Sequence, residues 1–195
     1  MQRTIISLIA GCFASFASCS KKEPLANVAT PAPPQQNLPA ADSKPAIDAC
    51  TLLTSAEIES VQGQPVQDTK PSVQSFGGLA ISQCYFTLTA QSNSVVLTVT
   101  QSAGGGNAVE VKKSWEQMLR GSESERKDGK EEKEKKPLKI EGIGDAAFWS
   151  GSHVGGAIYV LKGDSYIRIS VGGPGDSEAK IDKSKKLGQA VLNRL

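Results

Sequence analysis

The chain reads Cys84-Tyr85-Phe86-Thr87-Leu88-Thr89-Ala90 near its middle, and Val95-Val96-Leu97-Thr98-Val99-Thr100 follows after the short segment 91–94. Apolar and polar residues alternate in both stretches, which is the period of a strand with one buried face. The segment between them is rich in Ser and Asn and is typical of a turn. These stretches predict a β-hairpin in which Cys84 points into the core.

A second hairpin is predicted from 158–161 and 166–171, joined by the turn 162–165, with a further strand at 146–150. The residues between Gly63 and Gly78 are rich in Gln, Pro, Ser and Gly, and we expect a loop there.

Three helices are predicted around these strands. The first begins at Ser55, because Thr54 and Glu57 form a capping box, and it ends before Gly63. The second is capped by Asn107 and Glu110 and ends at Gly121, and its apolar stripe comprises Val111, Trp115, Met118 and Leu119. The third is capped by Asp176, and its stripe comprises Ile181, Leu187, Val191 and Leu195.

The order of these elements predicts an α+β fold, in which an antiparallel sheet of two hairpins carries amphipathic helices on one face. A hairpin, a glycine-rich break and a helix follow one another in each half, so a duplicated hairpin-helix unit is one reading. Because the sequence identity between the two halves is low, the alternative is that they share only a similar pattern without a duplication. A single globular domain is expected over residues 47–195, with a charged insertion at 122–136.

The charge balance is nearly even, with 22 basic and 20 acidic residues. A chain this close to neutral gives no electrostatic reason to expect nucleic acid as a partner. The stretch 122–136 contains six acidic and six basic residues, so it is no polybasic patch either. We interpret it as a solvated excursion, with a protein-docking loop as the alternative.

The first residues are typical of an export signal. One positive charge, Arg3, precedes a short apolar stretch that ends in small residues before Cys19. This end resembles the lipobox of bacterial lipoproteins, whose cysteine receives a diacylglyceryl group, although Phe16 stands where leucine is usual. We therefore expect a lipoprotein signal peptide at 1–18 and acylation of Cys19. Cys12 is a rival acylation site, and an ordinary secretory leader with incidental cysteines is the remaining alternative.

Residues 19–46 are dominated by Pro, Ala, Gln and Asn, which cannot bury enough apolar surface to order the chain. We expect a disordered tether there. Fully extended at about 3.1 Å per residue, its roughly 27 residues would reach about 80 Å. The domain is then expected in the periplasm, held to a lipid bilayer through Cys19. In bacterial lipoproteins an aspartate after the acylated cysteine often favours retention in the inner membrane, so the resemblance, with Ser20 at this position, implies the outer membrane.

Cys50 and Cys84 are the cysteines that remain after Cys12 and Cys19 are assigned to the leader and the anchor. An even pair in an exported domain is most simply a disulfide. A redox or metal-binding pair is the alternative, but the two cysteines lack Cys-x-x-Cys spacing.

The pattern Cys50-x-Leu52-Leu53-Thr54-x-x-Glu57-Ile58, with Cys84-x-Phe86 downstream, resembles a family of small bacterial lipoproteins of unknown function. The segment 142–149 is similar to one that such proteins carry before their second hairpin. The resemblance implies the fold and the disulfide. It supplies no catalytic residues, because the family has no settled activity.

No set of residues predicts catalysis, a metal or a cofactor. His153 is the single histidine and sits among glycines, and Gly104–Gly106 lacks the lysine of a phosphate loop. Trp115 and Trp149 are expected in the core. We expect a non-catalytic module that binds an envelope protein or a ligand; the alternatives are an enzyme using carboxylates such as Glu57 or Asp145, and a purely structural protein.

Overall fold

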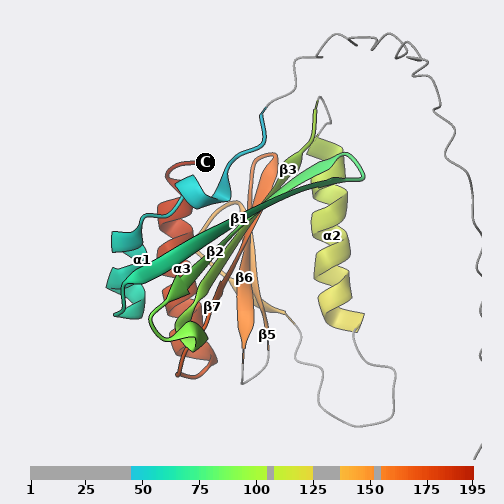
Figure 1. Ribbon diagram of the computed structural model, residues 1–195. Helices are drawn as coiled ribbons and strands as arrows, with labels where there is room; N and C mark the ends of the chain where they lie inside the picture. The colour runs from blue at the N-terminus through green and yellow to red at the C-terminus, as the bar shows by residue number, and fades with distance from the viewer. Residues whose placement is uncertain (1–44, 105–107, 125–136, 152–154) are drawn as a thin grey trace, which may run out of the picture. The chain divides into compact units, whose positions relative to one another are not determined.

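The computed structural model describes residues 45–104, 108–124, 137–151 and 155–195, which belong to one compact unit, Pro39–Leu195. Seven strands form one antiparallel sheet in the order β1-β2-β3-β7-β6-β5-β4 (Figure 1). The strands are β1 (Val66–Phe76), β2 (Leu79–Leu88), β3 (Val95–Ser102), β4 (Leu138–Ile140), β5 (Ala146–Gly151), β6 (Gly156–Lys162) and β7 (Ser165–Val171). The α-helices are α1 (Ser55–Gln62), α2 (Ala108–Ser124) and α3 (Ser177–Leu192), and short 3₁₀ turns occur at Ala49–Thr51 and Gln91–Asn93.

The prediction of an α+β fold with an antiparallel sheet is confirmed, but the sheet is larger than two hairpins. The predicted strand pairs are present as β2–β3 and β6–β7, and β3 pairs with β7 at the centre of the sheet. Strands β1 and β4 were not predicted. Residues 66–76 lie in the expected loop, yet they pair along their length with β2.

The prediction that the helices share one face of the sheet is wrong. Helices α1 and α3 cover one face, whereas α2 lies on the other (Figure 1). Strand β7 is covered on both faces. Ile167 and Ile169 pack with Leu187 of α3 on one face, and Tyr166 packs with Trp115 of α2 on the other. The fold therefore has three layers: two helices, the sheet and one helix.

This arrangement bears on the proposed duplication. Strands β3 and β7 are antiparallel neighbours, so a two-fold axis that exchanged them would run perpendicular to the sheet. Such an axis keeps each helix on the face where it started, but α2 and α3 occupy opposite faces. The duplicated unit is not confirmed.

The helix ends follow the sequence signals in part. Thr54 and Glu57 form the predicted capping box, and Gly63 ends α1 in the left-handed conformation. Asp176 caps α3 by accepting a hydrogen bond from the Ala179 amide. Helix α2 continues beyond the predicted end at Gly121 to Ser124. The predicted cap Asn107 lies outside the described residues.

The larger core lies between the sheet and the α1–α3 layer. Phe86, Leu97, Ile158, Ile169 and Val191 are among its fully buried members. The smaller core, under α2, is largely aromatic and centres on Trp115, Phe148 and Tyr166, with Val111. Both tryptophans are buried as predicted, Trp149 in the larger core and Trp115 in the smaller one.

Candidate functional site

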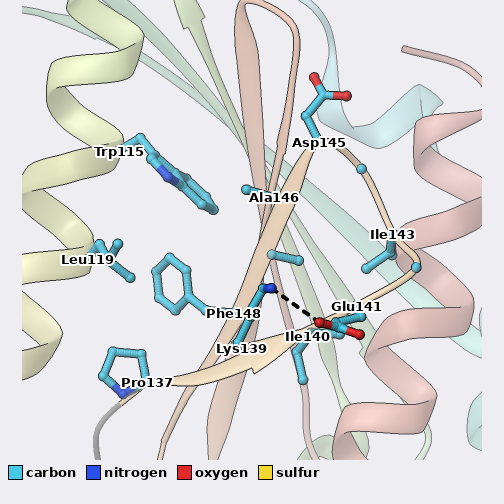
Figure 2. Close-up of a pocket in the computed structure, with 13 residues that line it drawn as sticks. Trp115, Leu119, Pro137, Lys139, Ile140, Glu141, Ile143, Asp145, Ala146 and Phe148 are labelled. Carbon is cyan, nitrogen blue, oxygen red and sulfur yellow. Dashed lines mark hydrogen bonds and ion pairs between the residues drawn. The ribbon is translucent and has the colours of Figure 1, made fainter.

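A cavity of about 500 Å³ lies between the C-terminal half of α2 and the β4–β5 edge of the sheet (Figure 2). One wall comes from the side chains of Trp115 and Leu119 on α2 and Phe148 on β5. The other side is the loop that joins β4 to β5. The remaining lining residues are Pro137, Lys139, Ile140, Glu141, Gly142, Ile143, Gly144, Asp145, Ala146 and Ala147.

The aromatic wall is held in place by ring packing. Trp115 meets Phe148 edge to face, with ring centroids 5.1 Å apart, and Phe148 stacks on Tyr159 at 4.7 Å. Trp115 also lies 5.9 Å from Tyr166, whose hydroxyl is 3.0 Å from that of Ser114. Packed rings of this kind gain about 0.5–1.5 kcal/mol per pair beyond their buried area. The wall is therefore a fixed surface.

The β4–β5 loop follows a path that requires glycine. Gly142 and Gly144 have φ angles of +76° and +63°, which side chains other than glycine rarely adopt. A Cβ on Gly144 would collide with the Val160 side chain and lie 2.6 Å from the Leu161 carbonyl oxygen. The loop therefore crosses β6 at backbone contact distance.

Asp145 fixes the end of this loop. Its amide donates to the Leu161 carbonyl at 2.8 Å, and its Oδ2 accepts from the Gly163 amide at 2.7 Å. Its Oδ1 lies 3.9 Å from Lys162 Nζ. Figure 2 shows the carboxylate directed away from Trp115 and Phe148. Asp145, which the sequence offered as a catalytic candidate, thus joins the loop to the β6–β7 turn.

The polar part of the rim is formed by Lys139 and Glu141, whose Nζ and Oε1 atoms lie 3.2 Å apart. Both side chains are more than four-fifths exposed, so water screens this ion pair. The rim can therefore offer either charge to a polar group of a bound molecule.

Glu57, the other carboxylate candidate, lies on α1, outside the cavity. It forms a two-pronged ion pair with Arg194, with Oε1 2.8 Å from Nη2 and Oε2 3.1 Å from Nη1. The hydrogen bond from Arg194 lowers the pKa of Glu57 from its usual 4.5 to about 2, and hydrogen bonds from Thr54 also lower it. The carboxylate is thus ionised, and its interactions join α1 to the C-terminal end of α3.

The Cys50–Cys84 disulfide is present, with its Cα atoms 5.0 Å apart. Cys84 is fully buried, as predicted for an inward-pointing residue of β2. The Ala49 amide donates to the Ser82 hydroxyl at 3.0 Å beside this bond. Together these contacts fasten the segment before α1 to the middle of β2.

Several candidates lie outside the described residues. They are the acylation sites Cys19 and Cys12, His153, most of Gly104–Gly106, and residues 125–136 of the charged stretch. Among the described residues there is no group of three or more His, Cys, Asp or Glu side chains that could hold a metal ion. None of the described helices combines the length and apolar character that a membrane span needs.

The cavity itself was not predicted from sequence. Its lining comes from α2, β5 and the loop between β4 and β5, and β4 had no strand pattern of its own. The only signal was the pair of glycines around Ile143, which indicates a constrained turn but no site. In comparisons with known proteins, no family model, no curated protein and no solved structure matches the chain.

Proposed function

We propose that this chain is a lipid-anchored protein of the bacterial cell envelope whose α+β domain binds a small, largely apolar molecule without transforming it. The anchor is acylated Cys19, which follows a signal peptide at 1–18 and is inserted in the outer membrane. The tether 19–46 links this anchor to the domain, which lies in the periplasm. The Cys50–Cys84 disulfide supports this localisation, because structural disulfides persist in oxidising compartments such as the periplasm.

The cavity is the observation that carries the binding role. Sites for small molecules are typically concave, of about 300–1,000 Å³, largely apolar and edged by a few polar groups. The cavity falls in this range and combines the aromatic wall with the rim residues Lys139 and Glu141. The ring contacts of Trp115 and the backbone contacts of the glycine loop support a preformed site, which binds without a large ordering cost.

The chemistry of the lining favours binding over turnover. Among the lining residues that the structure describes there is no Ser, Cys or His to act as a nucleophile or a general base. Of the two carboxylates that line the cavity, Asp145 already accepts from Gly163 and faces Lys162, and Glu141 is paired with Lys139. Glu57 is occupied by Arg194 on another part of the domain.

The binding site can be tested with the fluorescent probe 1-anilinonaphthalene-8-sulfonate, which combines an apolar ring system with one anionic group. We expect its emission to rise severalfold on saturable binding to the wild type. Leu119→Trp should abolish this rise, because the larger side chain fills the cavity. Met118→Trp is the matched control, since Met118 packs on the same aromatic cluster but does not line the cavity. Equal binding by both variants, or none by the wild type, would contradict the proposed site.

The alternatives have their own readouts. An envelope enzyme predicts turnover in a hydrolase screen that Glu57→Gln or Asp145→Asn abolishes. A role in binding another envelope protein predicts a specific partner in crosslinking and pull-down from cells, and that binding should survive Leu119→Trp. A purely structural protein predicts neither a ligand nor a partner.

A further inference from the structure

The segment before α1 shows at which end of the sheet the chain enters the domain. Cys50 is bonded to Cys84, and the Ala49 amide donates to Ser82, two residues closer to the β1–β2 turn. Further back, the Ile47 amide and the Pro45 carbonyl both bond to the side-chain amide of Gln101. Gln101 is the cross-strand partner of Ala80, which lies next to the residue that closes the turn. Whatever precedes Pro45 therefore joins the domain at the end that carries the β1–β2 turn.

Exposed apolar side chains gather at the same end. Phe76, directly before the Gly77–Gly78 turn, is 81% exposed, and its cross-strand partner Leu79 packs on the aromatic cluster under α2. The first turn of α2 lies beside this turn, because a Cβ on Gly78 would be 3.6 Å from Glu110 Cγ. The neighbouring Val109 is 62% exposed. Phe76 and Val109 are the two most exposed large apolar residues in the described ranges, and both lie at this end.

Basic residues continue this surface along α2. Lys112 and Lys113 follow Val109 by three and four positions, so they lie on the same exposed side of the helix. Glu110 in the first turn of α2 is partly buried and lies against Gly78, and Glu116, one turn beyond Lys112 and Lys113, is the first acidic residue on the side of the lysines. An aromatic apex followed by lysines is the composition of surfaces that rest on anionic lipid headgroups.

The edge of the sheet at β1 is poorly suited to pairing with a strand of another protein. Strand β1 is the edge of the sheet, and Pro71 in its middle has no N–H to donate to an added strand. Proline and lysine in an edge strand are devices that prevent strand addition, and Lys70 precedes Pro71.

We propose that the β1–β2 turn and the first turns of α2 form a membrane-contact surface, defined by Phe76, Val109, Lys112 and Lys113, and that Phe76 enters the bilayer interface. The inference rests on the lipid anchor proposed above. A single aromatic side chain binds lipid weakly by itself, but an anchored tether that enters the domain at this end keeps the surface at high local concentration near the bilayer. The domain then has a fixed orientation on the membrane.

The test imposes the anchor chemically. The mature chain from Cys19 onward, with its Cys50–Cys84 bond intact, has Cys19 as its only thiol. That thiol is coupled to a maleimide lipid in vesicles of phosphatidylcholine and phosphatidylglycerol. Phe76→Trp places a reporter at the apex, and Leu138→Trp is the matched control, because Leu138 is 55% exposed but lies on the opposite edge strand. The native Trp115 and Trp149 are buried and give a constant background.

We expect the emission added by Phe76→Trp to shift to the blue in vesicles and to be lost when the acyl chains are brominated. The emission added by Leu138→Trp should show neither change. Adding Lys112→Glu and Lys113→Glu should weaken the quenching of the apex reporter. Quenching of neither reporter, or equal quenching of both, would overturn the proposal. Because the coupling supplies the anchor, this outcome is independent of whether cells acylate Cys19.

Discussion

Breaking the Cys50–Cys84 bond should remove a large part of the stability of this domain. The bond closes a loop of 34 residues. On the chain-entropy model a link of that length disfavours the unfolded chain by about 2.1 + 1.5R ln 34 cal/mol/K, which is about 3.8 kcal/mol at 25 °C. A domain of this size has a total free energy of unfolding of about 5–15 kcal/mol. The reduced protein should therefore be markedly less stable.

The assay is urea unfolding of the oxidised chain and of the same chain reduced with a phosphine. We expect the free energy of unfolding to fall by about 3–4 kcal/mol on reduction. The double variant Cys50→Ala/Cys84→Ala should lose about 1 kcal/mol more, because Cys84 is fully buried and loses its sulfur contacts. A fall of less than about 1 kcal/mol on reduction would refute the reasoning. The disulfide would then add little constraint to the unfolded chain, because other contacts already restrict that chain.

Two further predictions concern the Glu57 ion pair and the glycine loop. Glu57→Gln should lower the free energy of unfolding by about 0.5–1 kcal/mol at neutral pH, a modest value because both partners are about one-third exposed. Since the pKa of Glu57 is lowered from 4.5 to about 2, this contribution is present above about pH 4.5 and is lost as the pH falls toward 2. Urea unfolding across that range should show the two proteins converging, and a constant difference would contradict the ion pair. Gly144→Ala should cost about 2–3 kcal/mol more than Gly163→Ala. Both glycines have positive φ angles, but only the Cβ at 144 meets other atoms, so equal losses in thermal or urea unfolding would contradict the described loop path.

The elements that could be predicted from sequence are those whose apolar residues recur or cluster and whose ends carry local signals. They are helices α1, α2 and α3 and strands β2, β3, β5, β6 and β7. Strand β1 could not be predicted, because ten of its eleven residues are exposed and carry no apolar pattern. It is held by its backbone ladder to β2, which leaves no trace in the sequence.

The face of the sheet that each helix covers could not be predicted from the sequence either. Apolar stripes on α2 and α3 show that each helix packs on something, but not on which side of the sheet. In β7 the odd-numbered and even-numbered residues are both apolar in part, with Ile167 and Ile169 on one face and Tyr166 on the other. That two-sided burial was the available sign of a three-layer fold, and a reading of one-sided alternation missed it.

The candidate site could not be predicted from the sequence for the same reason, because it depends on how distant segments pack together. Asp145 and Trp115 could be singled out in the sequence, but their roles follow from partners in β6 and β5 that lie far away along the chain. The disulfide was within reach of sequence reasoning, because composition and the leader limited the pairing to two cysteines.

The most direct test of the proposed envelope lipoprotein is metabolic labelling with an alkyne fatty acid in bacterial cells that express the chain. We expect label on the wild type and on Cys12→Ala, and none on Cys19→Ala. Label that persists on Cys19→Ala, or a wild type that stays unlabelled and keeps residues 1–18, would contradict acylation of Cys19.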